Sequence, residues 1–204
     1  MPDQTRRRSP RGSGEELRGE IIAAARDLMA RATTADEVSI RSVAAAVGVT
    51  APSIYLHFAD KQELISAVVV HVFDELDRAM VAASVSVADP LERLKAMGLA
   101  YVRFAIDHPE HYRLATMDPC PRPDVDQMLA AGCFVHFQEV VAECVSSGAF
   151  APGDLTLLTI ELWSAAHGIA ALLVAKPDLP IGDPMGIADR VLTAAAIGHL
   201  ASPS

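Results

Sequence analysis

The sequence predicts an all-α protein of about nine helices. Three observations support this fold class. Alanine, which has the highest helix propensity, recurs in runs at 23–25, 44–46 and 194–196. The aromatic residues that favour strands are few, with 6 Phe and 3 Tyr among 204 residues. Apolar residues recur at helical spacing between capping residues, and no strand pattern interrupts them.

The N-terminal third predicts an arm and three helices. Residues 1–12 hold four arginines within six positions and are expected to form a disordered arm. Ser13 and Glu16 make a capping box for the first helix. Its apolar stripe is expected at Leu17, Ile21, Ala24 and Leu28. Ser39 caps a second helix, which turns at Gly48 into a third. The inward positions of the second helix are Ile40, Val43, Ala44 and Val47.

Capping residues predict the remaining helices. Asp60 and Glu63 open a fourth helix that runs to about Ala83. Its apolar arc is so broad that it must pack on two sides, which indicates that it joins a small N-terminal unit to a larger one. The later helices are expected at about 89–107, from Pro109, and at 124–147, 154–176 and 183–200. We therefore expect an arm at 1–12, a helix-turn-helix domain at 13–60 and a second domain at 61–204.

Charge and cysteine content restrict the class of protein. The net charge of −9 divides into +1 over residues 1–61 and −10 over 62–204, so the first segment is the one suited to approach phosphates. Three cysteines make no disulfide framework and fit a reducing cytosol. The N-terminus lacks the apolar run of a signal peptide. The apolar stretch 162–175 is short for a membrane span, so a cytoplasmic protein with no membrane partner is expected.

The segment 39–61 carries the strongest functional pattern. Two short helices joined by a glycine turn are typical of a helix-turn-helix, whose second helix enters the major groove of DNA. On that helix Ile54 and Phe58 share one face, and Leu56 points elsewhere. Residues 21–64 resemble the TetR family of bacterial transcription regulators. The matching motifs are AxxxGVT at 44–50, SIYLHF at 53–58 and DKQEL at 60–64.

The resemblance implies roles for individual residues on double-stranded DNA. Phosphate contacts are implied for Thr50, Ser53, Tyr55, His57 and Lys61. Base edges or thymine methyls would be touched by Ala51, Pro52 and Tyr55, with Leu56 on the same surface and Arg41 able to reach a base. The alternatives are that Tyr55 covers the small core, that His57 is a solvated turn residue and that the arginine arm is a solvated tail.

The C-terminal half resembles the WHG-type C-terminal domain of one TetR subfamily. The matching segments are HPEHYRL at 108–114, Gly148 with PGD at 152–154, and WSAAHG at 163–168 followed by Leu172. Small residues on the last two helices would let a symmetry mate approach and build a four-helix homodimer interface, although packing within one chain is the alternative. These residues are Ser164, Gly168, Ala171, Ala175, Ala194, Ala195 and Gly198.

A second set of residues predicts a cavity for a small-molecule effector. Apolar walls with few polar groups describe a ligand pocket, and they equally describe a filled core. The candidates are Leu94, Met97, Tyr101, Phe104, Phe134, Phe137, Trp163 and His167. The function expected from all of this is a dimeric regulator, in the family's usual mode a repressor, that binds a near-palindromic operator and is released by a largely apolar molecule.

Other classes of protein remain as alternatives. The regulator could activate transcription or lack an effector, or the chain could be a ligand-binding protein or enzyme that has lost DNA binding. No catalytic motif stands out, and no cofactor is indicated. Metal sensing would use Cys133, His136 and Cys144. On one helix Cys133 and Cys144 lie about 16 Å apart, so they cannot ligate the same ion, and no metal site is expected.

Overall fold

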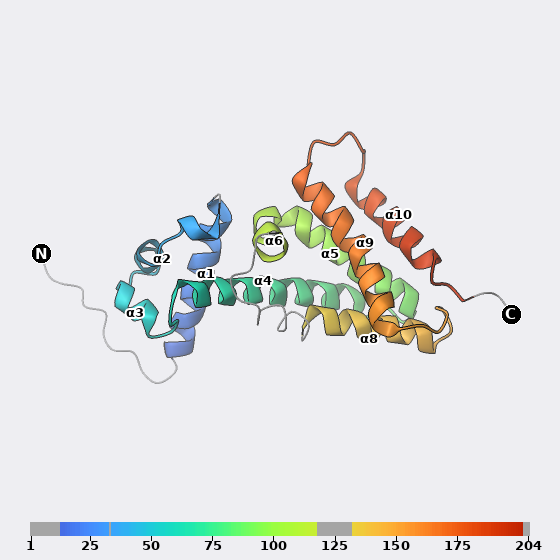
Figure 1. The fold of residues 1–204 in the computed structure, drawn as a ribbon, viewed down its shortest axis with the longest axis horizontal. Helices are drawn as coiled ribbons and strands as arrows, with labels where there is room; N and C mark the ends of the chain where they lie inside the picture. The colour runs from blue at the N-terminus through green and yellow to red at the C-terminus, as the bar shows by residue number, and fades with distance from the viewer. Residues whose placement is uncertain (1–12, 33, 118–131, 202–204) are drawn as a thin grey trace, which may run out of the picture. The chain divides into compact units, whose positions relative to one another are not determined.

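The computed structural model describes residues 13–32, 34–117 and 132–201. The predicted arm at 1–12 and the predicted helical residues 124–131 lie outside this range. The described residues form nine α-helices and one 3-10 helix, and their sole β feature is an isolated bridge between Phe150 and Leu200. The all-α prediction is confirmed (Figure 1).

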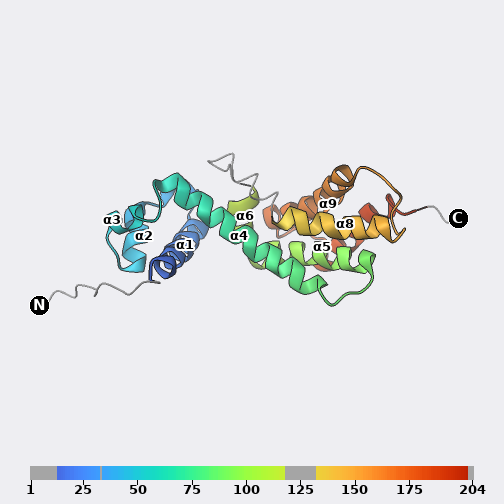
Figure 2. The same cartoon turned by 90° about the horizontal axis from the view of Figure 1, so that it is seen from below.

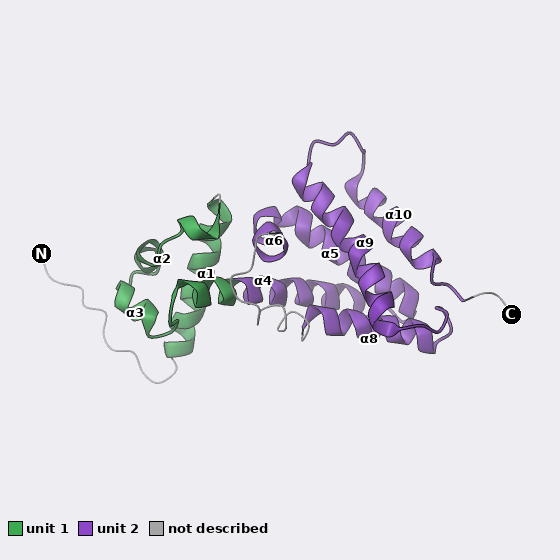
Figure 3. Cartoon of the chain, viewed as in Figure 1, with its two compact units in different colours: residues 1–68 green, residues 69–204 purple. Residues whose placement is uncertain are grey.

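The chain folds into two compact units, residues 1–68 and 69–204 (Figure 3). Helix α4, Lys61–Ser84, belongs to both. The division falls within α4 rather than at its first residue because Leu64, Ile65 and Val68 are buried with the N-terminal core.

Unit 1 is built from short helices around one small core. Its elements before α4 are α1 (Ser13–Arg31), η1 (Ala35–Glu37), α2 (Ile40–Val47) and α3 (Ala51–Tyr55). The predicted stripe of α1 was partly wrong: Ile21 is buried, but Leu17, Ala24 and Leu28 are only half-buried. The buried face is Ile21, Ile22, Ala25 and Met29. Both the predicted stripe and the buried face of α1 contain alanine and larger apolar residues at helical spacing. The spacing alone therefore does not show which of the two is buried.

Local hydrogen bonds fix both ends of α2. The Ser39 side chain accepts from the Ser42 backbone N–H at 3.1 Å, and Ser42 Oγ accepts from the Ser39 N–H at 3.1 Å, so the predicted cap is confirmed. At the other end Gly48 has φ +76° and donates to the carbonyls of Ala44 and Ala45. This left-handed conformation favours glycine because a Cβ would crowd the backbone.

We expect Gly48→Ala to destabilise the protein by about 1–2 kcal/mol. The open space around Gly48 means that the cost comes from the residue's own left-handed backbone and not from contacts with other parts of the protein. Thermal denaturation should show the loss in the unfolding transition that includes unit 1. Gly14→Ala, in α1 with ordinary φ and equally open space, is the control and should leave the transition unchanged or raise it. Equal effects from the two substitutions would contradict the left-handed requirement at Gly48.

Unit 2 is a bundle around α5. Besides α4 it contains α5 (Pro90–Asp107), α6 (Pro109–Thr116), α8 (Cys133–Ser146), α9 (Leu155–Ala175) and α10 (Pro184–Ile197). Helix α5 packs against α8, α9 and α10, and α9 and α10 run side by side in opposite directions (Figures 1 and 2). The side chains of Asp89, Asp154 and Asp183 accept first-turn N–H groups, so all three predicted caps are confirmed.

Helix α10 ends earlier than predicted, at Ile197 and not near Leu200. The reason is a competing set of backbone hydrogen bonds. The Ala151 N–H donates to the His199 carbonyl at 2.9 Å, and the Ala201 N–H donates to the Ala149 carbonyl at 3.1 Å. The last described residues therefore pair with the α8–α9 loop instead of extending the helix.

Helix α9 starts before the apolar stretch 162–175 and is longer than that stretch suggested. It has 21 residues and a mean hydropathy of 1.7, so by length and composition it could cross a membrane. Core helices of bundles pass the same test. Helix α9 packs against α5, α8 and α10 in such a bundle. However, only 39% of its most apolar window is buried. Much of its apolar surface is thus uncovered in the single chain.

Candidate DNA-binding surface and ligand cavity

Helix α3 is fixed from its inner side. Ile54 and Phe58 are buried, with 0% and 1% of their surfaces exposed, as their shared face predicted. The Arg18 guanidinium lies 5.0 Å from the centroid of the Phe58 ring. This cation–π contact joins α1 to the segment after α3 and helps to hold the short helix in place.

The outer side of α3 carries large side chains that no packing explains. Tyr55 is 53% exposed and Leu56 is 84% exposed. Tyr55 therefore does not cover the small core. Pro52 is exposed and Ala51 and Ser53 are half-exposed, while the Thr50 and Ser53 hydroxyls lie 2.9 Å apart. His57 is half-buried. Every member of the predicted α3 set is therefore at least partly accessible, and Thr50 holds the N-cap position without bonding the helix backbone.

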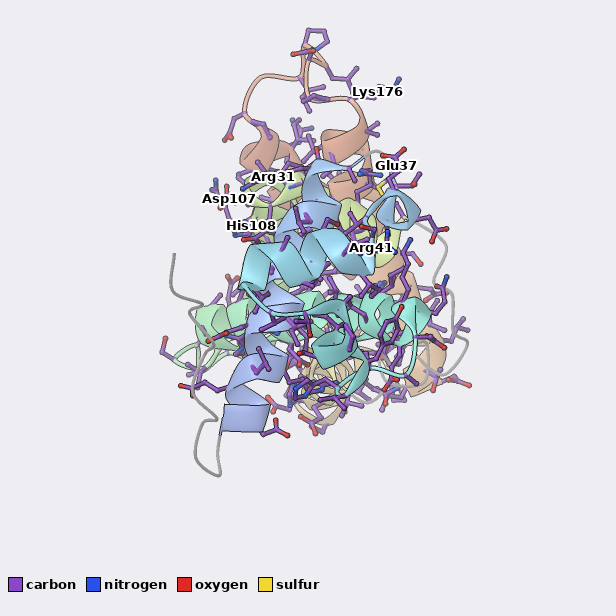
Figure 4. All side chains as sticks on the ribbon, turned by 90° about the vertical axis from the view of Figure 1, so that its left-hand side faces the viewer. Arg31, Glu37, Arg41, Asp107, His108 and Lys176 are labelled. Atoms are coloured by element: carbon purple, nitrogen blue, oxygen red, sulfur yellow. The ribbon has the colours of Figure 1, made fainter. Side chains whose placement is uncertain are left out.

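Arg41 stands exposed in the first turn of α2, the helix that packs against α3 (Figure 4). It makes no ion pair with the residues that the structure describes. Its guanidinium is therefore available to a ligand outside the chain, which is what a base contact requires.

Lys61 has a partner that the sequence did not reveal. Its Nζ donates to the Asp36 carbonyl at 2.5 Å and lies 3.4 Å from the Asp36 carboxylate. The contact joins the first residue of α4 to η1. A phosphate that binds Lys61 must compete with this carboxylate.

In unit 2 five of the predicted ligand residues form a continuous aromatic cluster: Tyr101, Phe134, Phe137, Trp163 and His167. The Trp163 ring centroid lies 5.3 Å from that of Tyr101, 5.8 Å from that of Phe137 and 5.9 Å from that of Phe134. The buried members of the predicted set are Leu94, Met97, Tyr101, Phe104 and Phe137. Phe134, Trp163 and His167 are half-buried.

A hydrogen-bonded triad lies at one end of this cluster. The Tyr101 and Tyr112 hydroxyls are 3.0 Å and 2.9 Å from His167 Nδ1 and 3.3 Å from each other. Burial raises the pKa of both tyrosines and lowers the pKa of His167. At neutral pH the tyrosines therefore remain protonated hydroxyls and His167 is neutral, so the triad is a network of uncharged hydrogen bonds that is shared at Nδ1. Sequence reasoning missed Tyr112, although its HPEHYRL segment had been singled out.

A separate cavity of about 220 Å³ lies among α5, α8, α9 and α10. It includes Leu94 and Phe137 of the predicted ligand set and Ala195 of the predicted dimer set. The other predicted ligand residues do not line it. Its walls are Leu91, Glu92, Leu94, Lys95, Gly98, Phe137, Leu162, Leu192, Thr193, Ala195, Ala196, Ile197 and Leu200.

The cysteines of α8 are free and buried. Burial raises the pKa of Cys133 to about 12 and that of Cys144 to about 11, so both are thiols at neutral pH. His136 instead bonds the Asp77 carboxylate of α4 at 2.8 Å. Within the described ranges no group of three metal-ligating side chains comes together.

Two family models match the sequence. Residues 21–68 match the model of bacterial regulatory proteins of the tetR family. Residues 94–195, half of the chain, match the model of the tetracyclin repressor-like C-terminal domain. The chain belongs to the TetR family. This TetR-family protein is a DNA-binding transcription regulator with a helix-turn-helix and is not an enzyme. No curated protein matches its sequence.

Solved structures share the fold of this TetR-family regulator. A protein of unknown function from Rhodococcus sp. RHA1 has 23% identity and a TM-score of 0.78, covering 98% of this chain and 100% of that one. A TetR family transcription regulator from Marinobacter aquaeolei VT8 has 17% identity and a TM-score of 0.70, covering 91% and 98%. RolR in complex with resorcinol has 18% identity and a TM-score of 0.68, covering 93% and 90%.

The predicted dimer residues of the TetR-family regulator lie mostly on the open side of α9 and α10. Ser164, Gly168 and Ala175 are exposed and Ala171 is half-exposed. On α10, Ala194 and Gly198 are exposed, whereas Ala195 is half-buried and lines the cavity. Large apolar residues outside the predicted dimer set are also exposed on these two helices and the segment after α10. They are Leu157, Ile160, Leu172, Ile197 and Leu200.

The triad predicts a pH dependence of stability. Because burial lowers the pKa of His167 below its ordinary value of 6.5, the folded regulator binds this proton less readily than the unfolded chain. The contribution of neutral His167 to the free energy of unfolding is fully present above about pH 6.5, and it decreases as the pH falls below that value. We expect His167→Gln to flatten the fall in melting temperature between pH 7 and pH 5.

His136 provides a control of opposite sign. The hydrogen bond to Asp77 raises the pKa of His136. The stability that this bond contributes is therefore fully present below about pH 6.5, and it is lost as the pH rises through the pKa of His136 in the folded protein. His136→Gln should therefore steepen the acid fall in melting temperature. Parallel pH profiles for wild type and His167→Gln would contradict the role assigned to the triad.

Proposed function

We propose that this regulator is a cytoplasmic homodimeric repressor that binds a near-palindromic operator and leaves it when a small, largely apolar effector binds. The main observation in support of this proposal is the apolar face of α9 that the single chain leaves exposed. Leu157, Ile160 and Leu172 are 55%, 48% and 46% exposed, and the small residues Ser164 and Gly168 lie between them. A contiguous apolar face of this kind is typical of a protein interface.

A second copy of the chain fits this face. Closed two-fold symmetry is the commonest arrangement of homo-oligomers, and it places the same patch on both sides of the interface. Helix α10 contributes Ile197, which is 60% exposed, and the exposed small residue Ala194. The dimer would present two α3 helices to DNA, with half-sites about 34–36 Å apart or a multiple of that distance.

Effector binding in unit 2 would act on DNA binding by linkage. A ligand that prefers one arrangement of the two recognition helices must change operator affinity, and operator must change ligand affinity by the same factor. Helix α4 can transmit the effect of the ligand to the helix-turn-helix because its residues belong to both units. RolR, which shares the fold, binds the small aromatic molecule resorcinol, which supports a compact ligand here.

Selection of operator fragments from the genome of origin tests the proposal. The full-length protein should retain fragments with a near-palindrome. Light scattering should give twice the chain mass without DNA, and at least two chains plus the mass of the fragment with DNA. A promoter reporter carrying the selected site should fall when the regulator is expressed. A rise in the reporter would replace repression by activation, and a stable monomer that binds DNA tightly would contradict the dimer.

Arg41→Ala tests the base contact. We expect the variant to keep its fold, since Arg41 is exposed, and to lose discrimination at particular base pairs by about 1–3 kcal/mol per contact. Competition binding against single-base operator variants measures this. Arg31→Ala, at the end of α1, is the control because it removes the same charge from another exposed site of unit 1. An unchanged preference profile for Arg41→Ala would show that Arg41 does not read a base.

A further inference from the structure

The cavity of unit 2 has an apolar interior and a charged rim. Its inner walls are leucine, isoleucine, phenylalanine and alanine side chains and the backbone of Gly98, from four helices and the segment after α10. Glu92 and Lys95, one turn apart on α5, and Thr193 on α10 are its polar lining residues. The charges at this rim determine which kind of polar group a ligand can place there.

The positive charge of Lys95 is already compensated by an ion pair within the chain. Its Nζ lies 2.6 Å from the Asp189 carboxylate on α10. The hydrogen bond to Asp189 raises the pKa of Lys95, so the lysine remains charged within this pair. An anionic ligand would have to displace Asp189 and would then lie near two carboxylates.

Glu92 is the uncompensated charge. Its side chain is exposed and lies within the electrostatic influence of Lys95, yet it forms no ion pair among the residues described. Counting Glu92, Lys95 and Asp189 together, the rim carries one net negative charge. An approaching cation gains from this charge and an anion is repelled.

We propose that the cavity binds an organic monocation, a protonated amine or quaternary ammonium that carries a small apolar group. The cationic nitrogen pairs with Glu92, and the apolar group fills the space between α5 and α10. This proposal names the chemical class of the effector and rests on the proposed function only for the effect of binding on DNA.

The size of the cavity limits the apolar group. A volume of about 220 Å³ is below the range of about 300–1,000 Å³ that is usual for drug-sized ligands. At about 30 Å³ for each water-sized group, it accommodates roughly seven non-hydrogen atoms, with the polar group of the ligand outside them at the rim. Gly98 sets one wall, because a Cβ there would lie 3.0 Å from Leu192 Cδ1.

Three probes of equal chain length test the class of ligand: octylammonium, 1-octanol and octanoate. Trp163 is the only tryptophan in the chain, and its ring lies 5.8 Å from that of the cavity residue Phe137, so its fluorescence reports binding without a label. Calorimetry on the full-length protein gives the affinities. We expect octylammonium to bind about three- to fivefold more tightly than 1-octanol, as a partly exposed ion pair allows, and octanoate to bind most weakly.

Substitutions connect the preference to the site. Glu92→Gln should abolish the preference for octylammonium while leaving the affinity for 1-octanol unchanged. Glu139→Gln, on the exposed side of α8 and outside the cavity lining, is the matched control and should retain the preference. Ala196→Met should weaken binding of all three probes by filling the cavity, with circular dichroism verifying its fold.

The outcomes separate this proposal from the proposed function. Failure of all three probes to bind, octanoate binding as tightly as octylammonium, or an unchanged preference in Glu92→Gln would overturn the ligand class. If octylammonium binds in a Glu92-dependent manner and operator affinity stays constant, the ligand class is supported and the release mechanism is wrong. If operator is released by octanoate and not by octylammonium, the release mechanism stands and the ligand class is wrong.

Discussion

The double variant Ile160→Glu, Leu172→Glu should be a folded monomer that binds operator DNA at least about 100-fold more weakly than wild type. Both side chains are about half exposed on α9, so the single chain tolerates the substitutions. In the proposed dimer they would bury four carboxylates without partners, which costs several kcal/mol. A monomer also binds without the avidity of two linked half-sites, which is worth about 10²–10⁴ in affinity.

Light scattering and a mobility-shift titration measure the two effects, and circular dichroism verifies the fold. Val85→Glu is the matched control, because Val85 is 76% exposed and follows α4 instead of lying on α9. It should remain dimeric with unchanged operator affinity. A double variant that is still dimeric would place the interface elsewhere on the chain.

The second large effect is expected for the double variant Tyr55→Ala, Lys61→Ala. We expect about 100-fold weaker binding to every DNA sequence, because both residues are predicted to contact phosphates and hydrogen bonds to charged groups contribute about 1.5–3 kcal/mol each. Removing the lysine should reduce the slope of log K against log salt by about one unit, because one fewer phosphate is neutralised by a cationic side chain.

Asp36→Asn distinguishes a phosphate contact from a structural role of Lys61. The substitution removes the carboxylate that competes for Lys61 and keeps the backbone carbonyl that accepts its hydrogen bond. We expect Asp36→Asn to bind DNA as tightly as wild type or more tightly, with an unchanged salt slope. If it instead weakens binding as much as Lys61→Ala does, the lysine acts by holding η1 against α4.

The fold was predictable because its determinants are local. The caps at Ser39, Asp89 and Asp154 are recognisable from residues three positions apart, and the structure confirms each. The interactions between helices were not predictable. Lys95 and Asp189 lie far apart in the sequence, so their pairing depends on how α10 packs on α5.

The position of the cavity shows the same limit. Large aromatic side chains were predicted to line the cavity, but in the structure they pack against one another and fill their own space. The open volume lies among α5, α8, α9 and α10, where the small residues Ala195 and Ala196 are part of the lining and leave room that neighbouring side chains do not close. Periodicity places a residue on a face of a helix, and it does not show how well two faces fill the space between them.

The backbone pairing after α10 has a practical consequence for protein engineering. Phe150 is fully buried, its ring lies 5.8 Å from that of His199, and the neighbouring residue Leu200 belongs to the cavity wall. A reporter domain or affinity tag fused directly after Ile197 would therefore replace part of the binding site with linker. Fusions that begin after Ala201 retain both backbone hydrogen bonds and should respond to ligands as the unmodified protein does.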